Sequence, residues 1–153
     1  PAIAERVAQA GLENMLPPVR LDVTQAQWPF VGSFDLIYCA NMLHIAPWEA
    51  CEGLMAGAAR HLAPGGVLVT YGPYFENGVP AAPGNLEFDE SLRGRDAAWG
   101  IRRVEDVVQV AGERGLGLGR RIAMPANNLV LVFPGGHPNC PTCGHSNCST
   151  WPG

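Results

Sequence analysis

Apolar residues recur at helical spacing in three segments of this chain. The three sets are Ile3, Val7 and Ala10; Trp48, Cys51, Leu54, Met55, Ala58 and Leu62; and Val104, Val107, Val108 and Ala111. Residues three and four apart lie on one face of a helix, so each set predicts an amphipathic helix. Pro47 suits the first position of the second helix, and Gly11, Pro64-Gly65-Gly66 and Gly115 are natural stops for the three.

Short apolar runs between and after these helices predict strands. We expect strands at residues 19–23, 34–40, 67–71, 118–123 and 129–133. The run 34–40 is almost continuously apolar, which is typical of a strand buried on both faces of a parallel sheet. Residues 73–100 are rich in Gly, Pro and Asn and then in charge, which predicts a long loop. The order of elements predicts an α/β domain with a mainly parallel sheet.

The composition changes abruptly at Pro134, where we place the end of a single domain over residues 1–133. Residues 134–153 form a polar tail of turn formers without periodicity, for which we expect disorder or a non-native extension. The tail holds weak candidates for a zinc site, namely Cys140, Cys143, His145 and Cys148, with His137 nearby. They lack the usual spacing between two pairs of zinc ligands, so we expect no metal.

Charge and cysteine content narrow the class of protein. The formal net charge of −4 argues against a nucleic-acid backbone as partner. No apolar run approaches the ~18 residues that span a bilayer, and no signal-peptide pattern is visible, so we expect no membrane partner. Cys39 and Cys51 lie in apolar segments and are predicted to be buried, reduced thiols. The uneven cysteine count of 5 then predicts a cytoplasmic location.

Three segments resemble the later part of a class I S-adenosylmethionine (SAM)-dependent methyltransferase: residues 21–23, 34–49 and 62–73. Together with residues 88–93, 95–96, 99–102 and 124–129, they are similar to the uncharacterised methyltransferase-like twenty-six family, and the resemblance covers nearly all of residues 1–133. It implies a Rossmann-like sheet of seven strands in the order three-two-one-four-five-seven-six. It also implies SAM as cofactor and a small-molecule methyl acceptor.

The resemblance further implies that the first two strands and the SAM-binding glycine-rich loop precede residue 1. We therefore expect a cofactor-deficient fragment that is inactive alone, in which strand 34–40 has an open edge. A homodimer can cover such an edge. The alternative function is a non-catalytic fragment or pseudoenzyme that binds a protein partner through the same edge.

Candidate cofactor residues follow the predicted strands 19–23 and 34–40. In similar methyltransferases the residue at the place of Asp22 accepts a hydrogen bond from the adenine amino group, and the next backbone N–H, here that of Val23, meets a ring nitrogen. Asn41 and Met42 lie where open α/β sheets bind ligands, at the carboxyl end of a strand. The alternative for Asp22 is a turn residue that binds its own backbone.

His44 and Asn41 are the candidate catalytic residues. Imidazole has an unperturbed pKa near ~6.5, so His44 can take a proton at neutral pH. Asn41 can orient the substrate or the methionine part of the cofactor. A structural histidine bonded to a backbone carbonyl is an equally good interpretation of His44.

Candidate substrate-binding residues lie near the strand ends and in a predicted lid over residues 89–103. They are Trp48, Tyr71, Arg93, Arg95, Asn127 and Asn128. Trp48 can cover an adenine ring, and either arginine can clamp an acidic substrate. The alternatives are core packing for the aromatic residues, a solvated charged face for the arginines and a turn for the asparagines.

Overall fold

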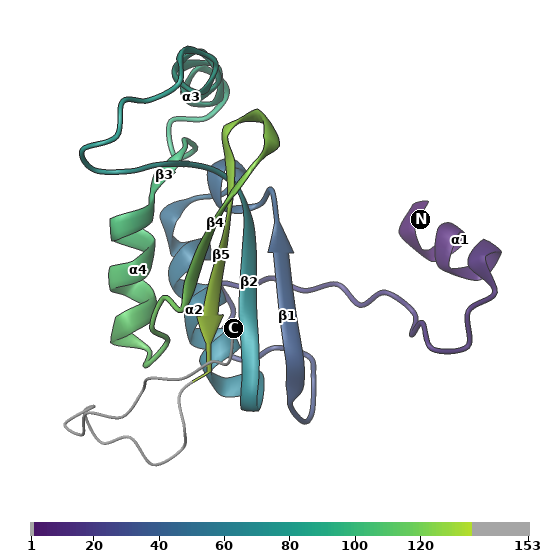
Figure 1. The fold of residues 1–153 in the computed structure, drawn as a ribbon. Helices are drawn as coiled ribbons and strands as arrows, with labels where there is room; N and C mark the ends of the chain where they lie inside the picture. Colours follow the sequence, from purple (N-terminus) through teal and green to yellow (C-terminus); the bar gives the residue numbers. More distant parts are fainter. Residues whose placement is uncertain (1, 136–153) are drawn as a thin grey trace, which may run out of the picture.

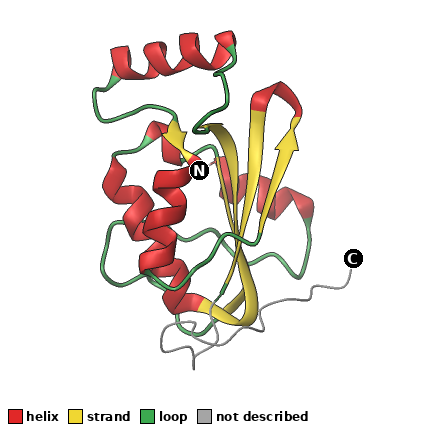
Figure 2. Ribbon diagram, turned by 60° about the vertical axis from the view of Figure 1, so that its left-hand side comes forward, coloured by secondary structure: helices red, strands yellow, loops and turns green. Residues whose placement is uncertain are grey.

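The computed structural model describes residues 2–135 as a sheet with helices packed on one face (Figures 1 and 2). The elements in chain order are α1 (Ala2–Ala10), β1 (Phe34–Ala40), the short 3-10 helix η1 (Leu43–Ile45), α2 (Trp48–His61), β2 (Leu62–Phe75), α3 (Pro83–Arg95), β3 (Arg102–Arg103), α4 (Val104–Glu113), β4 (Arg120–Met124), the 3-10 helix η2 (Pro125–Asn127) and β5 (Asn128–Pro134). The three predicted helices are confirmed, as are the strands expected at 34–40, 67–71, 118–123 and 129–133, with adjusted ends.

The sheet is mixed, so the prediction of a mainly parallel sheet is wrong. Its strands are ordered β1-β2-β5-β4, and the short β3 pairs with the end of β2. β1 and β2 are parallel, whereas β5 is antiparallel to both of its neighbours. β4 and β5 are joined by the tight turn η2, in which Ala126 and Asn127 have φ of 59° and 57°. So short a connection can only join antiparallel strands.

One face of the sheet carries the core. Leu68, Leu131 and Phe133 point to this inner face and are fully buried. α2 and α4 cover it, as the helices on one side of the sheet in Figure 2 show. Buried Tyr74 donates a hydrogen bond to the Thr70 hydroxyl at 2.8 Å, so this pair of polar groups is satisfied within the core. Apolar burial on this face is the main source of the fold's stability.

The opposite, outer face of the sheet is exposed at β1, so the prediction that this strand is buried on both faces is wrong. Leu36 and Tyr38 are 56% and 61% exposed, while Ile37 and Cys39 pack against the core. Within residues 2–135 the helix α1 lies apart from the sheet, joined to it by an extended segment (Figure 1). Cys51 is buried as predicted, whereas Cys39 is only half-buried.

The strand predicted at residues 19–23 does not form, because residues 19–22 are exposed and Val23 lies against α2 rather than beside another strand. The Val23 carbonyl accepts a hydrogen bond from Trp28 Nε1 at 3.4 Å. The Trp28 ring is buried and stacks on His61 with 5.2 Å between centroids. A Cβ at Gly57 would lie 1.9 Å from the Trp28 ring, so the indole can pack here only because Gly57 has no side chain. An isolated apolar run becomes a strand only where another strand satisfies its backbone.

Residues 73–100, predicted as a loop, contain the helix α3. Only Leu92 of this helix is buried, so it has no apolar stripe that periodicity could detect. Pro83 begins it, at a position where the missing N–H costs nothing. The helix α2 ends at His61, before the Pro64-Gly65-Gly66 stop that the sequence indicates, because the chain passes directly into the long strand β2.

Residues 2–135 contain neither a helix suited to cross a membrane nor a cluster of side chains suited to hold a metal ion. None of the helices in this part of the chain has the length and apolar character needed to cross a membrane. Residues 2–135 bring together no group of three or more His, Cys, Asp or Glu side chains that could hold a metal ion. The weak zinc candidates Cys140, Cys143, His145 and Cys148 lie outside the described residues, as does nearly all of the predicted tail 134–153.

Candidate functional site

The site is built where the chain leaves β1. Asn41 has φ of 53°, a left-handed conformation that asparagine adopts more readily than most residues. Its backbone N–H donates to the Tyr71 carbonyl of β2 at 2.8 Å, which ties the turn to the neighbouring strand. The chain then enters η1, which carries His44. The two predicted catalytic residues, Asn41 and His44, therefore follow the carboxyl end of β1.

The side chains of Asn41 and His44 face the same space beside Gly72. A Cβ at Gly72 would lie 3.5 Å from His44 Nδ1 and 3.7 Å from Asn41 Oδ1. Gly72 is itself buried within β2, so its lack of a side chain keeps this space open. The structure thus brings together an amide oxygen and an imidazole nitrogen that are three residues apart in sequence.

The imidazole of His44 is buried and lies against an aromatic ring. It is only 6% exposed, and the edge of the Phe88 ring of α3 packs on it with 5.6 Å between centroids. Burial lowers the pKa of His44 below its ordinary value, and the positive charge of Arg102 lowers this pKa further. Neither ring nitrogen is hydrogen-bonded to another residue of the described chain. The backbone carbonyl of His44, rather than its ring, is bonded, and it accepts from the Gly100 N–H at 3.1 Å.

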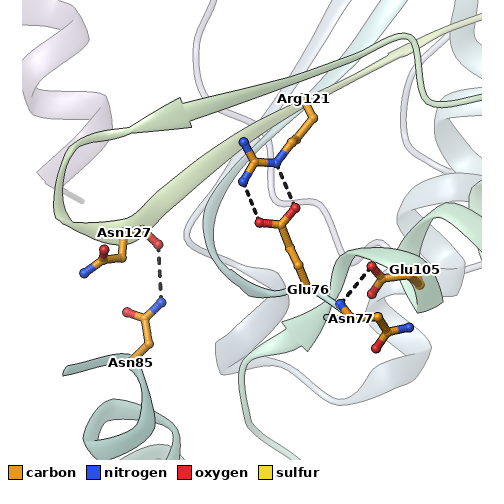
Figure 3. Close-up of polar contacts among 6 residues, drawn as sticks. All are labelled: Glu76, Asn77, Asn85, Glu105, Arg121 and Asn127. Atoms are coloured by element: carbon orange, nitrogen blue, oxygen red, sulfur yellow. Dashed lines mark hydrogen bonds and ion pairs between the residues drawn. The ribbon is translucent and has the colours of Figure 1, made fainter. Parts of the chain in front are cut away.

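The helix α3 spans the top of the site. Asp89 anchors it, because its Oδ1 accepts from the Ile101 N–H at 2.7 Å and its Oδ2 from Arg93 Nε at 2.9 Å. At the other end of α3, Asn85 Nδ2 donates to the Asn127 carbonyl at 3.3 Å, which joins the helix to the β4–β5 turn (Figure 3). α3 occupies the first half of the region predicted as a lid, and Phe88 is the residue by which it reaches His44.

A small hollow of about 220 Å³ lies between the segment after β2 and the β4–β5 hairpin. Its wall mixes polar and apolar groups, with amides at Asn85, Asn127 and Asn128, and its apolar lining residues include Tyr74, Val79, Pro80, Ala81, Met124 and Leu129. At its side the Glu76 carboxylate accepts from both Arg121 Nε, at 2.8 Å, and Arg121 Nη2 (Figure 3). This two-pronged pair balances the only carboxylate and guanidinium that line the hollow, so the hollow suits an uncharged molecule.

A larger hollow of about 590 Å³ lies between α2 and α4. Its wall is charged, with Glu52, Asp106 and Glu113 opposite Arg93, Arg102 and Arg103. Asn41, His44 and Gly72 line neither hollow, whereas Trp48 and Arg93, two of the predicted substrate residues, line the larger one. We place the candidate site at the strand ends because the two predicted catalytic side chains meet there beside Gly72.

The other predicted substrate residues lie around this edge in different settings. Tyr71 is half-buried in β2, opposite Val130 of β5. Trp48 is half-buried against the core, with the Arg102 guanidinium 5.6 Å from its ring centre. Arg93 is paired with Asp89, and Arg95 lies 5.6 Å from the centre of the Trp99 ring. An acidic substrate would have to compete with Asp89 for Arg93.

Asp22 and Val23, the predicted adenine contacts, lie in a turn on the segment that docks on α2, where Asp22 is exposed and Val23 is half-buried. Asp22 Oδ1 accepts from the Thr24 N–H at 3.0 Å and from the Thr24 hydroxyl at 2.7 Å, and these bonds lower the pKa of the carboxyl. The carboxylate is solvent-exposed and retains lone pairs for a further donor. Its geometry is that of a turn residue, and this geometry leaves the adenine contact possible.

Sequence reasoning missed Gly72, Phe88 and Arg102. The glycine sits inside an apolar run with no local mark of a ligand site, and Phe88 belongs to a helix without an apolar stripe. Arg102 was one of several charged residues in the predicted lid. Its role depends on contacts with residues 56 and 59 positions away, which no local pattern reveals.

The chain has an α/β fold that resembles that of class I methyltransferases, and polar residues lie at the carboxyl end of β1. The sequence profile of the family described as "Protein of unknown function (DUF938)" matches residues 1–134. This chain belongs to the DUF938 family. The finer resemblance to the methyltransferase-like twenty-six family stays a prediction.

Solved structures similar to this chain include several methyltransferases. "LaPhzM" matches with a TM-score of 0.69 and 16% identity, covering 88% of this chain and 39% of its own. CalO1, described as a methyltransferase in calicheamicin biosynthesis with SAH bound, gives 0.63 and 16%, covering 77% and 34%. An O-methyltransferase family 2 protein from Planctomyces limnophilus, in complex with apigenin, gives 0.61 and 19%, covering 69% and 32%.

These similarities establish the fold and leave the reaction open. The chain spans 39% or less of the length of these three proteins. Another similar structure, with a TM-score of 0.65 and 16% identity over 84% of this chain and 33% of its own, is described as a pericyclic reaction enzyme. One fold supports different reactions, and the residues of the site determine which reaction a protein performs.

Proposed function

We propose that this chain is the acceptor-binding part of a SAM-dependent O-methyltransferase that acts on a small, uncharged hydroxylated molecule. The observation that carries the proposal is the pairing of a buried His44 imidazole with the Asn41 amide beside Gly72. Its ring nitrogens have no hydrogen-bond partner within residues 2–135, so one is open to the proton of a bound acceptor. Burial lowers the pKa of His44, which favours the unprotonated ring, and an unprotonated ring nitrogen can accept a proton.

Asn41 orients the methyl acceptor, and His44 takes up its proton. Asn41 Oδ1 accepts a hydrogen bond from the acceptor or from the methionine part of the cofactor, and His44 takes the proton of the attacking hydroxyl. Bound SAM would supply the methyl carbon, to which the acceptor oxygen would bond as the carbon–sulfur bond breaks. Alignment for such an in-line displacement is itself a large part of catalysis. Phe88 lies against His44 and offers an apolar contact for the body of the acceptor.

Asn41 and Met42, at the end of β1, and Asp22 and Val23, in the turn beside α2, carry groups that fit SAM chemically. Bound SAM supplies an electrophilic methyl group on a positively charged sulfur. An uncharged His44 does not repel that charge, as a protonated histidine would. Asp22 would accept from the adenine amino group, the Val23 N–H would meet a ring nitrogen, and Asn41 and Met42 would border the methionine part. Similar proteins whose structures were solved with SAH include CalO1 and PigF.

The test is methyl transfer by the native protein. With isotopically labelled SAM and a panel of phenols and aliphatic alcohols, we expect a methylated product by mass spectrometry for at least one uncharged acceptor. His44→Gln should lower kcat by about 100-fold or more with little change in SAM affinity. Gly72→Val fills the space beside His44 and should raise KM for the acceptor.

Matched controls separate the roles. His61→Gln changes a histidine on the far end of α2, where it stacks on Trp28, and should leave transfer unchanged. Native protein that binds neither SAM nor SAH in a calorimeter would overturn the proposal. So would His44→Gln with full activity.

A second candidate function is a protein-interaction module that uses β1. Its outer face presents Leu36 and Tyr38, which are 56% and 61% exposed, and β1 is the end strand of the described sheet. An exposed apolar strand edge is a template for pairing with another chain, including a second copy of this one. Light scattering of the native protein with and without Tyr38→Lys tests self-association through this edge.

A further inference from the structure

Arg102 makes an unusual set of contacts for a guanidinium. Its Nε donates to the Leu43 carbonyl at 3.0 Å, and its Nη2 donates to the Ala46 carbonyl at 2.6 Å and to the Ala98 carbonyl at 2.8 Å. Leu43 is the first residue of η1 and Ala46 follows its last residue, so the two lie on either side of His44. The planar fork of an arginine can hold both at once, which a lysine ammonium does less well.

The charge of Arg102 is balanced by carbonyl dipoles rather than by a carboxylate. The ion pairs in the described part of the chain are Arg93–Asp89 and Arg121–Glu76, and neither involves Arg102. Its guanidinium also lies over the Trp48 ring at 5.6 Å from the centre. The last carbonyls of a helical turn carry partial negative charge and favour a cation at this place. The positive charge therefore remains effective at His44.

A second contact fixes the other side of the turn. The Gly100 N–H donates to the His44 carbonyl at 3.1 Å. Gly100 has φ of 150°, and a Cβ there would lie 2.8 Å from Arg93 Nη2 and 2.9 Å from Asp89 Oδ1. Only glycine fits this position without displacing the Arg93–Asp89 pair. The segment from Ala98 to Arg102 thus grips the backbone around His44 and is itself anchored to α3.

We propose that Arg102 is a positioning residue, which holds the turn that carries His44 through the Leu43 and Ala46 carbonyls. The proposal rests on the proposed function for its catalytic meaning, since a neutral His44 matters only if His44 is the base. The groups that face His44 are Phe88 of α3, the Asn41 side chain, Gly72 of β2 and the charge of Arg102. Asp89 and Arg93 of α3 and Glu49 of α2 act on Arg102 itself.

NMR titration of the histidine rings in the full chain tests the proposal. The chain has 4 histidines, and His44→Gln identifies the His44 signals. In Arg102→Gln the charge is lost, and we expect the pKa of His44 to rise. In Arg102→Lys the charge stays while the fork is lost. The pKa of His44 should then remain low, but the Gly100 amide should exchange at least tenfold faster than in the wild type.

Arg103→Gln is the matched control. Arg103 is the next residue, but it donates to the Asn77 side chain and not to the His44 turn, so both readouts should stay at wild-type values. An unchanged His44 pKa in a folded Arg102→Gln variant would overturn the proposal. If Arg102→Gln does not fold, the Arg102→Lys variant tests the proposal instead. A Gly100 amide that exchanges at the wild-type rate in that variant would overturn the proposal that Arg102 holds the His44 turn. Neither readout requires methyl transfer, so failure of the proposed function is separately visible.

Discussion

The inner and outer faces of the same sheet differ sharply in how they are covered. On the inner face Leu68, Leu131 and Phe133 are 0% exposed beneath α2 and α4. On the outer face Leu36 and Tyr38 of β1 are more than half exposed. Both faces are apolar in sequence, so composition does not distinguish them. The difference shows that the described helices give this sheet one core, and that β1 contributes to it with Ile37 and Cys39 only.

The same contrast explains where the candidate site lies. The site occupies the rim of the sheet, where the covered face ends and the turns after β1 and β2 meet under α3. His44 is buried there by Phe88, whereas Asn41 remains exposed. A rim position combines a desolvated imidazole with access for a ligand, which neither face of the sheet provides by itself.

The largest predicted effect is a matched pair of leucine truncations on the two faces. Leu131→Ala removes a fully buried side chain and should lower the free energy of unfolding by about 3–5 kcal/mol. Leu36→Ala, the same change at a residue that is 56% exposed, should cost less than about 1 kcal/mol. Urea unfolding followed by circular dichroism measures both. Equal losses would show that another part of the protein covers the outer face.

A second pair of variants tests whether Trp28 packs on α2, the helix that covers the inner face of the sheet. A Cβ at Gly57 would lie 1.9 Å from the Trp28 ring, so Gly57→Ala must displace the indole and should cost about 1–3 kcal/mol. Gly112→Ala in α4 meets nothing within 4 Å and should stabilise the protein by roughly 0.5–1 kcal/mol. Urea unfolding gives the sign of each change in the free energy of unfolding. Near-ultraviolet circular dichroism reports on the packing of Trp28. A stable Gly57→Ala variant with an unchanged spectrum would refute the packing.

A smaller effect concerns the ion pair at the rim of the inner face. The Arg121 guanidinium lowers the pKa of Glu76 below its ordinary value of 4.5. A carboxyl with a lowered pKa stabilises the fold fully above pH 4.5 and loses this contribution as the pH falls through its folded pKa. The pair is partly exposed, so we expect only about 0.5 kcal/mol. Thermal melts of the wild type and Glu76→Gln should differ at pH 7 and converge at low pH.

The smallest effect on stability is expected on the outer face itself. Tyr38→Lys places a charge at a residue that is 61% exposed, and the free energy of unfolding should change by no more than about 0.5 kcal/mol. Ile37→Lys, one position along on the covered side, should destabilise the protein clearly. If β1 mediates self-association, light scattering should show that Tyr38→Lys reduces it. A large loss of stability from Tyr38→Lys would mean that the outer face is covered.

The sequence alone determined the elements with strong local patterns. The apolar spacing around Leu54 and Val107 defines α2 and α4, because residues three and four apart share a helical face wherever the helix packs. The apolar run 34–40 defines β1, and its end places Asn41 and His44 after a strand. The α/β class follows from the order of these elements. The strand predicted at 19–23 shows the limit, because an apolar run needs a neighbouring strand before it pairs.

The tertiary structure decided how these elements meet. The antiparallel insertion of β5 beside β2, the placement of α3 over His44 and the docking of Trp28 on Gly57 all depend on contacts between distant residues. Arg102 is the clearest case, since the carbonyls it holds lie 56 and 59 positions away. Local periodicity reflects which face of an element is apolar. It carries no information about which other element will cover that face, and in this protein that choice determines both the core and the site.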